Sequence, residues 1–347
     1  MSKIAVLGDL HIGIHKGNPV FEEALKYFIE DLFIPTLVKE GITEVIQLGD
    51  LVDRPTVIRY LDMVHLRNNF IEPLMDAGVN LHVLVGNHDV PFNRDTLTPS
   101  APVELLNGYP IRVYDRPCET VIAGLPCVML PWICRDNADT TFNLTKRTKC
   151  KVVFAHLELN DFQMYKGVTC KEGMDPSIFK DFSLVCSGHF HQPNSKGIIH
   201  YLGAPMQFTW ADAGCARGFW ILDTDTLELR FIQNRNDMFV LYTYENGVFS
   251  SMDVKNKYVK VYAKEIDDRK RFDAYIRALE NAGAIEVKVN ENEISLVSLI
   301  EVDDTKYEVE NDERIFHDYI EAIVDSKLNK NKLESIILNA RKEALLS

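Results

Sequence analysis

The stretch Val83-Leu84-Val85-Gly86-Asn87-His88-Asp89 passes from an apolar run directly into glycine and three polar residues. A short apolar run of this kind is typical of a buried strand. Four further stretches with metal-binding side chains each follow a short apolar run: Gly8-Asp9-Leu10-His11, Gly49-Asp50-Leu51-Val52-Asp53, Ala155-His156 and Gly188-His189-Phe190-His191. Because ligands bind at the carboxyl ends of strands in open α/β sheets, the five stretches together predict one site.

The spacing and type of these polar residues point to metal ions. Asp9 and His11 are two positions apart, as are His189 and His191, so each pair faces one side of an extended segment. Asp, Asn and His without Cys suit divalent ions such as manganese, iron or zinc. Two ions ~3.5–4 Å apart need a bridging ligand. We expect Asp50, at the end of the second strand, to be that bridge.

Strand and helix patterns alternate through residues 1–235. The first three strands are expected at Lys3–Leu7, Glu44–Leu48 and Leu81–Val85, with helices at Phe21–Glu40 and Ile58–Leu74. This order predicts an α/β fold with a mostly parallel sheet flanked by helices. Later strands, which suggest a second sheet in the same layered core, are expected at Val121–Ile122, Cys127–Leu130, Val152–Phe154, Leu184–Cys186, Ile198–Leu202, Phe219–Leu222 and Leu227–Ile232. The last two are expected to form a hairpin.

The pattern changes after residue 235. Residues 236–300 hold a strand–helix–strand pattern with alternating apolar residues in Tyr258–Tyr262 and Ile285–Val289, so we expect a small αβ domain there. Residues 301–347 combine an acidic linker with two amphipathic helical patterns. This C-terminal helix pair would pack either on its own domain or on a partner chain.

Charge and composition limit the class of protein. The 347 residues include 38 basic and 51 acidic side chains, a net charge of −13, which argues against binding nucleic acid by charge alone. Bound divalent ions or a basic partner chain would supply positive charge locally. No apolar run reaches the ~18–20 residues of a membrane span and no signal peptide is evident, so we expect a cytoplasmic protein without membrane contact. The seven scattered cysteines are expected to be reduced thiols.

Taken together, the five stretches resemble the motif set of the calcineurin-like metallophosphoesterase superfamily: D-x-H, G-D-x-x-D, G-N-H-D, a later H and G-H-x-H. Within it, the chain is similar to the SbcD/Mre branch of DNA double-strand-break repair nucleases, above all to the nuclease subunits of T-even-phage recombination endonucleases. The segments Tyr201-Leu202-Gly203-Ala204-Pro205, Leu130-Pro131-Trp132 and Arg217-Gly218-Phe219-Trp220 add to this likeness. It covers residues 1–235 and, beyond them, rests on the order of elements.

The resemblance implies a role for each motif residue. One metal ion would be held by Asp9, His11 and His191, with Asp50 bridging, and the other by Asn87, His156 and His189. His88 would bind no metal, but would face the substrate and protonate the leaving oxygen or stabilise the transition state. Asp53 would orient His88 through a pairing of its carboxylate with the imidazole. Many cellular members carry a histidine where Asp53 stands, and Asp53 makes this chain more similar to the phosphatase pattern Gly-Asp-x-x-Asp-Arg.

The resemblance also implies an activity and partners. The family implies 3′→5′ exonuclease action on duplex DNA and endonuclease action on single strands, with two Mn²⁺ ions, or Mg²⁺ as the alternative. It implies a homodimer within a complex of two nuclease and two ABC-type ATPase chains. The small domain would cap the DNA, and the C-terminal helices would dock on the ATPase. No G-x-x-x-x-G-K-[ST] motif occurs, so this chain is not the ATPase.

Two other hypotheses remain open from the sequence. One is a stand-alone phosphodiesterase or protein phosphatase that uses Asp53 and Arg54 in the phosphatase manner. The other is a non-catalytic scaffold that works through its C-terminal helices, although the complete set of candidate ligands argues against it.

Overall fold

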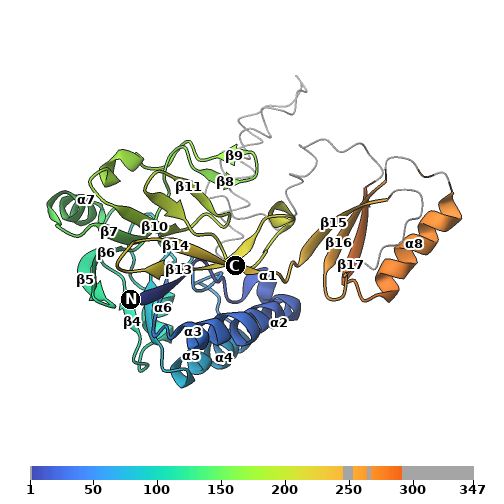
Figure 1. The fold of residues 1–347 in the computed structure, drawn as a ribbon, viewed down its shortest axis with the longest axis horizontal. Helices are drawn as coiled ribbons and strands as arrows, with labels where there is room; N and C mark the ends of the chain where they lie inside the picture. Colours follow the sequence, from blue (N-terminus) through green and yellow to red (C-terminus); the bar gives the residue numbers. More distant parts are fainter. Residues whose placement is uncertain (1, 245–252, 264–265, 267, 291–347) are drawn as a thin grey trace, which may run out of the picture. The chain divides into compact units, whose positions relative to one another are not determined.

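The computed structural model describes residues 2–244, 253–263, 266 and 268–290. The expected C-terminal linker and helix pair, residues 301–347, lie outside the described residues. Within the described part, two six-stranded sheets pack against each other and carry the five motifs (Figure 1).

The first sheet has the strand order β14-β13-β1-β2-β3-β4. Its strands are β1 (Lys3–Leu7), β2 (Glu44–Gln47), β3 (Asn80–Leu84), β4 (Arg112–Tyr114), β13 (Arg217–Asp223) and β14 (Leu229–Asn234). Strands β1 to β4 are parallel. Strand β13 runs antiparallel to β1 and pairs with β14. The predicted parallel strands and the predicted hairpin are therefore confirmed.

The second sheet has the order β11-β12-β10-β7-β6-β5. Its strands are β5 (Cys118–Ile122), β6 (Leu125–Leu130), β7 (Val152–His156), β10 (Leu184–Gly188), β11 (Asn194–Lys196) and β12 (Ile199–Tyr201). Its four central strands, β12, β10, β7 and β6, all run parallel to one another. Strand β7 ends on His156, and β10 ends just before His189, so both deliver candidate ligands at their carboxyl ends.

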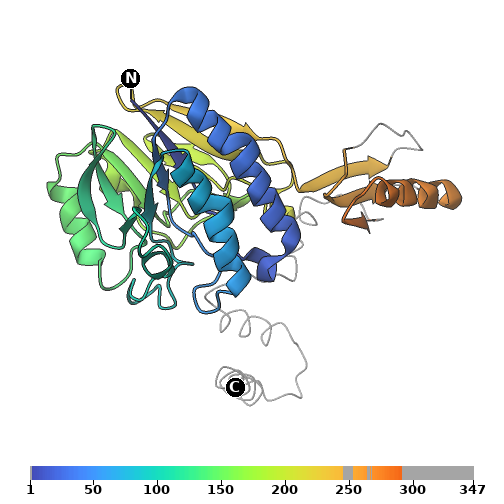
Figure 2. The same ribbon diagram turned by 90° about the horizontal axis from the view of Figure 1, so that it is seen from below.

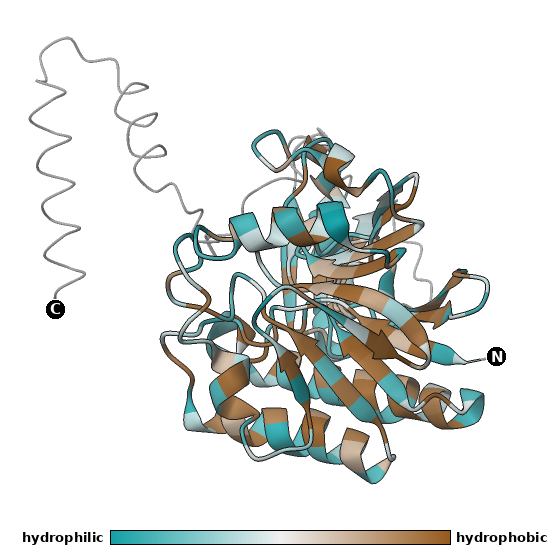
Figure 3. Cartoon of the chain, turned by 90° about the vertical axis from the view of Figure 1, so that its left-hand side faces the viewer, coloured by the Kyte–Doolittle hydropathy of each residue, from teal (hydrophilic) through white to brown (hydrophobic). Residues whose placement is uncertain are grey.

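The apolar strand residues alternate between two layers. Val6, Ile46 and Leu84 of the first sheet belong to the core between the sheets, together with Met129, Phe154 and Cys186 of the second. Ala5, Val45 and Val83 face the opposite way, into the helical layer. Because both faces of these strands are buried, their sequences are almost continuously apolar, as the brown strands in Figure 3 show.

Two long helical segments cover the outer face of the first sheet (Figure 2). They consist of α2 (Pro19–Tyr27), the π-helical turn η1 (Phe28–Phe33) and α3 (Ile34–Glu40), then α4 (Tyr60–Leu66), the π-helical turn η2 (Arg67–Ile71) and α5 (Glu72–Asp76). Each π-helical turn comes just before a proline, Pro35 or Pro73. Proline lacks an N–H and crowds the preceding turn, and a wider turn is one way to continue the helix. The helix predicted over Phe21–Glu40 therefore continues past Pro35 by way of a π-helical turn.

Shorter elements complete this part of the chain. They are α1 (Ile14–Gly17), α6 (Ala101–Leu105), α7 (Ala138–Arg147), the hairpin of β8 (Gln163–Tyr165) and β9 (Val168–Thr169), and the 3-10 turns η3 (Pro176–Phe179) and η4 (Trp210–Asp212). Helix α7 packs on the second sheet through Leu144. Among the described residues, no helix is long and apolar enough to cross a membrane.

A separate three-stranded sheet follows residue 235. Its parallel strands are β15 (Phe239–Tyr244), β16 (Tyr258–Ala263) and β17 (Glu286–Asn290), with α8 (Arg269–Asn281) between the last two. The sheet and α8 share an apolar core that includes Val259, Val261, Phe272 and Tyr275. The strand–helix–strand unit expected from the sequence is present, whereas β15 was not predicted. The domain boundary at residue 235 stays a prediction.

Candidate metal centre

The motif side chains converge into three groups of donor atoms, each group lying within 4.8 Å. The groups are Asp9, His11 and His191; Asp50, His156 and His189; and His11, Asp53 and His88. Asn87 joins the second group, because its Oδ1 lies 2.9 Å from His156 Nε2 and 2.9 Å from His189 Nδ1. The structure thus brings together all nine residues that the sequence selected.

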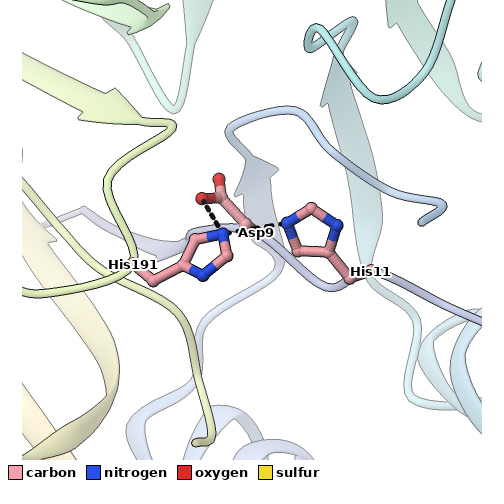
Figure 4. Close-up of side chains that lie close together, drawn as sticks. All are labelled: Asp9, His11 and His191. Carbon is pink, nitrogen blue, oxygen red and sulfur yellow. Dashed lines mark hydrogen bonds and ion pairs between the residues drawn. The ribbon is translucent and has the colours of Figure 1, made fainter. Parts of the chain in front are cut away.

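The first group places two imidazoles and a carboxylate around one point (Figure 4). His11 Nε2 lies 3.0 Å from His191 Nε2, which lies 3.6 Å from Asp9 Oδ2. Burial lowers the pKa of His191 to about 4. Burial, with the neighbouring His88 and His191, also holds the pKa of His11 well below its ordinary value. Both imidazoles are therefore favoured in the neutral form that metal ligation needs.

Asp50 lies between the first and second groups. Its Oδ2 is 3.8 Å from His11 Nε2 and 3.3 Å from His156 Nε2. Although burial opposes a charged imidazole, the Asp50 carboxylate raises the pKa of His156 to about 9. The site therefore favours positive charge between Asp50 and the histidines, which is the environment that suits a divalent cation.

Main-chain atoms orient the ligand side chains. His156 Nδ1 donates to the carbonyl of Leu48 at 2.7 Å, which directs Nε2 toward the donor group. The glycines of the motifs make room for the same side chains. A Cβ at Gly86 would lie 2.2 Å from Asp50 Oδ1, and one at Gly188 would lie 2.6 Å from Asp9 Oδ1. The donor set and this close backbone approach both fit a pair of divalent ions.

Three candidate ligands have left-handed backbone conformations. The φ angles are 46° for His11, 54° for Asp50 and 86° for His189. Such φ values are uncommon outside glycine and persist only where surrounding contacts impose them. Here the N–H of His11 donates to the Asp50 carbonyl at 3.0 Å, and the N–H of His189 donates to the Asp9 carboxylate at 3.1 Å. The ligand motifs therefore hold one another in place.

Asp89 supports the site, although the sequence analysis assigned it no role. Its side chain is fully buried, and it accepts hydrogen bonds from the N–H groups of Asp50 (2.9 Å), Gly86 (2.8 Å) and Val52 (3.1 Å). Burial, followed by the nearby Asp50, raises the pKa of Asp89 to about 7. Its position at the end of Gly86-Asn87-His88-Asp89 was the only available signal, since two of its three partners, Asp50 and Val52, come from another loop.

His88 is oriented by Asp53, but through the main chain. His88 Nδ1 donates to the Asp53 carbonyl oxygen at 2.9 Å, so Nε2 takes no part in this contact. The Asp53 carboxylate instead lies 3.6 Å from His11 Nδ1 and 3.7 Å from Arg54 Nε. The expected pairing between the Asp53 carboxylate and His88 is thus replaced by a backbone contact, and the carboxylate faces a candidate ligand.

Comparison with known proteins places this geometry in a family. The model of the calcineurin-like phosphoesterase family matches residues 2–193. The chain belongs to this family. As a calcineurin-like phosphoesterase it is a hydrolase that acts on phosphodiester bonds, and the divalent metal ions of the family fit the donor groups described above.

Individual relatives extend the comparison beyond the family domain. Exonuclease subunit 1 of Enterobacteria phage T4 is 31% identical over 327 residues, which cover 93% of each chain. DNA double-strand break repair protein Mre11 of Sulfurisphaera tokodaii is 26% identical over 219 residues, 59% of this chain and 54% of that protein. Among solved structures, an archaeal phosphodiesterase matches with a TM-score of 0.35 and 13% identity, over 67% of this chain and 99% of that chain.

Proposed function

We propose that this phosphoesterase is a DNA nuclease with a dinuclear metal centre. In it, Asp9, His11 and His191 hold one ion, Asn87, His156 and His189 hold the other, and Asp50 bridges them. The observation that carries the proposal is the Asp50 carboxylate, whose Oδ2 lies 3.8 Å and 3.3 Å from one histidine of each group. The similarity to an exonuclease subunit and to a DNA break repair protein supports DNA as the substrate.

When bound, two divalent ions supply a hydroxide nucleophile near neutral pH and neutralise the charge of the phosphate. In this proposal His88 is the general acid that protonates the leaving oxygen. Its Nδ1 is held by the Asp53 carbonyl, and in this proposal Nε2 would carry the proton to the leaving oxygen. Although burial opposes the charged form, Asp50 raises the pKa of His88. The Asp50 carboxylate therefore acts in the direction of the protonated form that a general acid needs.

More specific proposals concern the metal ion, the activities and the assembly. We propose Mn²⁺ as the native ion, with Mg²⁺ as the alternative, because the donors are only oxygen and nitrogen. The proposed activities are 3′→5′ exonuclease on duplex DNA and endonuclease on single strands, in DNA end processing, recombination, replication and repair. The proposed assembly is a homodimer with two ABC-type ATPase subunits. The name of the phage relative, an exonuclease subunit, supports an assembly of this kind.

A DNA digestion assay tests the proposal. The purified chain, alone and with its ATPase, is incubated with Mn²⁺ and either end-labelled linear duplex or circular single-stranded DNA. We expect both substrates to be degraded, and His88→Ala to lose most of this activity. His200→Ala, on β12, is the matched control and should keep it. Intact DNA together with cleavage of a phosphopeptide or a cyclic nucleotide would instead identify a stand-alone phosphatase or phosphodiesterase.

A further inference from the structure

Phe208 packs against both histidines of the first donor group. Its side chain is fully buried, and its ring centroid lies 5.4 Å from that of His11 and 5.3 Å from that of His191. The rings meet edge to face, at 85° and 77°. Because one rigid ring contacts both imidazoles, a change in its position alters the orientation of each.

The main chain of Phe208 is held on both sides. His15 Nε2 donates to the Phe208 carbonyl at 2.8 Å. The Phe208 N–H donates to the carboxylate of Asp212 at 2.8 Å, and Asp212 also forms a buried ion pair with Arg217. The ring that touches the histidines therefore has a fixed anchor in the surrounding fold.

The preceding residue ties this anchor to the start of the small sheet. Gln207 is buried, and its Oε1 accepts hydrogen bonds from the N–H groups of Met238 (2.9 Å) and Phe239 (2.8 Å). Phe239 is the first residue of β15, and its ring lies 5.0 Å from that of Trp210. Residues 207–210 thus contact both the candidate ligands and the beginning of β15.

We propose that Phe208 is a positioning residue for the His11–His191 pair, and that Gln207 couples its position to the start of β15. The inference rests on the proposed metal function and extends it to residues that bind no metal. Packing around a metal site controls the orientation of its ligands. Gln207 and Phe208 are consecutive, and the Phe208 ring packs on His11 and His191 of the first donor group. We therefore expect a change at the start of β15 to weaken the ion that Asp9, His11 and His191 would hold more than the ion that Asn87, His156 and His189 would hold.

Metal titration of the full-length chain tests this coupling. Wild type, Phe208→Leu and Gln207→Ala are titrated with Mn²⁺ alone, and the visible absorption of the Co²⁺-substituted proteins is recorded. In both variants we expect one of the two ions to bind about tenfold more weakly, with a changed Co²⁺ spectrum for that ion. Phe179→Leu, an equally buried phenylalanine packed on the second sheet, is the matched control and should bind both ions as wild type does.

Three other results would contradict different parts of the proposal. Wild-type affinities and an unchanged Co²⁺ spectrum in Gln207→Ala would overturn the coupling, even if its melting temperature fell. Equal weakening of both ions in either variant would overturn the selective effect. Should Phe208→Leu fail to fold, Gln207→Ala tests the same contact with the ring intact. Failure of wild type to bind two ions would overturn the proposed function itself, so the two failures are distinguishable.

Discussion

Asp50 is the residue on which most of the site depends. Its main-chain carbonyl accepts from the N–H groups of Leu10 and His11, both at 3.0 Å, and its own N–H donates to Asp89. One side-chain oxygen, Oδ1, accepts from the N–H of His88 at 2.8 Å, and the other faces both donor groups. The same carboxylate therefore orients the proposed acid and completes the proposed bridge.

Replacing Asp50 with asparagine tests the charge of this side chain without changing its size. Asp50→Asn keeps the size of the side chain but removes the charged bridge, so we expect the affinity for both ions to fall, by about 10–100-fold. Isothermal titration with Mn²⁺ measures this change. Asp31→Asn, an exposed acid in η1, serves as the control. Two ions bound with wild-type affinity in Asp50→Asn would contradict the bridging role.

The ends of neighbouring strands, and the glycines that follow them, set the distances between the candidate ligands. Strand β2 leads into Gly49 and Asp50, and β3 leads through Val85 into Gly86. Strands β2 and β3 are parallel neighbours, so the Gly86 backbone passes beside the Asp50 side chain. This close approach explains the glycine better than a turn does, because Gly86 is not among the positive-φ residues.

Alanine at Gly86 therefore tests the spacing between these strand ends. Its Cβ would lie 2.2 Å from Asp50 Oδ1 and 2.4 Å from Asp50 N, so we expect Gly86→Ala to displace Asp50 and to abolish high-affinity binding of both ions. Gly78→Ala is the matched control. Gly78 has a φ of 70° and open space around its Cβ, so alanine there costs about 1–2 kcal/mol of stability and leaves the ions bound.

Urea denaturation and Mn²⁺ titration of the two glycine variants distinguish strain from crowding. A folded Gly86→Ala that binds two ions normally would show that Asp50 can move aside without loss. Loss of the ions in Gly78→Ala would show that backbone strain alone accounts for the effect.

In the chain as a whole, we expect the segment after residue 313 to serve partner binding and not metal binding. The amphipathic patterns expected there lie outside the described residues, whereas every candidate ligand lies between Asp9 and His191. We therefore expect truncation after Glu313 to leave Mn²⁺ binding unchanged and to abolish association with the proposed ATPase subunit. Size-exclusion chromatography of the mixed chains, with the intact chain as control, measures association. A complex that survives the truncation would place the docking surface elsewhere in the chain.

Local sequence pattern determined much of this protein. Apolar runs of strand length and the positions of Asp, Asn and His sufficed to predict the parallel strands and the hairpin of β13 and β14. They also selected nine residues that the structure brings together, whose roles stay predictions. Strand β15 was missed, because its sequence follows a polar segment and it pairs with the distant β16. The same pattern, through the family motifs, led to phosphodiester hydrolysis.

Which atom of each residue faces which partner became clear only from the tertiary structure, and not from the sequence pattern. The sequence could not predict that the Asp53 carbonyl orients His88 while its carboxylate faces His11. Nor could it predict the contacts of Asp89 with Asp50 and Val52, or of Phe208 with His11, because these partners lie far away along the chain. The physical reason is that strand periodicity sets the direction of a side chain only within a regular strand. Beyond the strand end, left-handed φ angles and long-range hydrogen bonds set that direction.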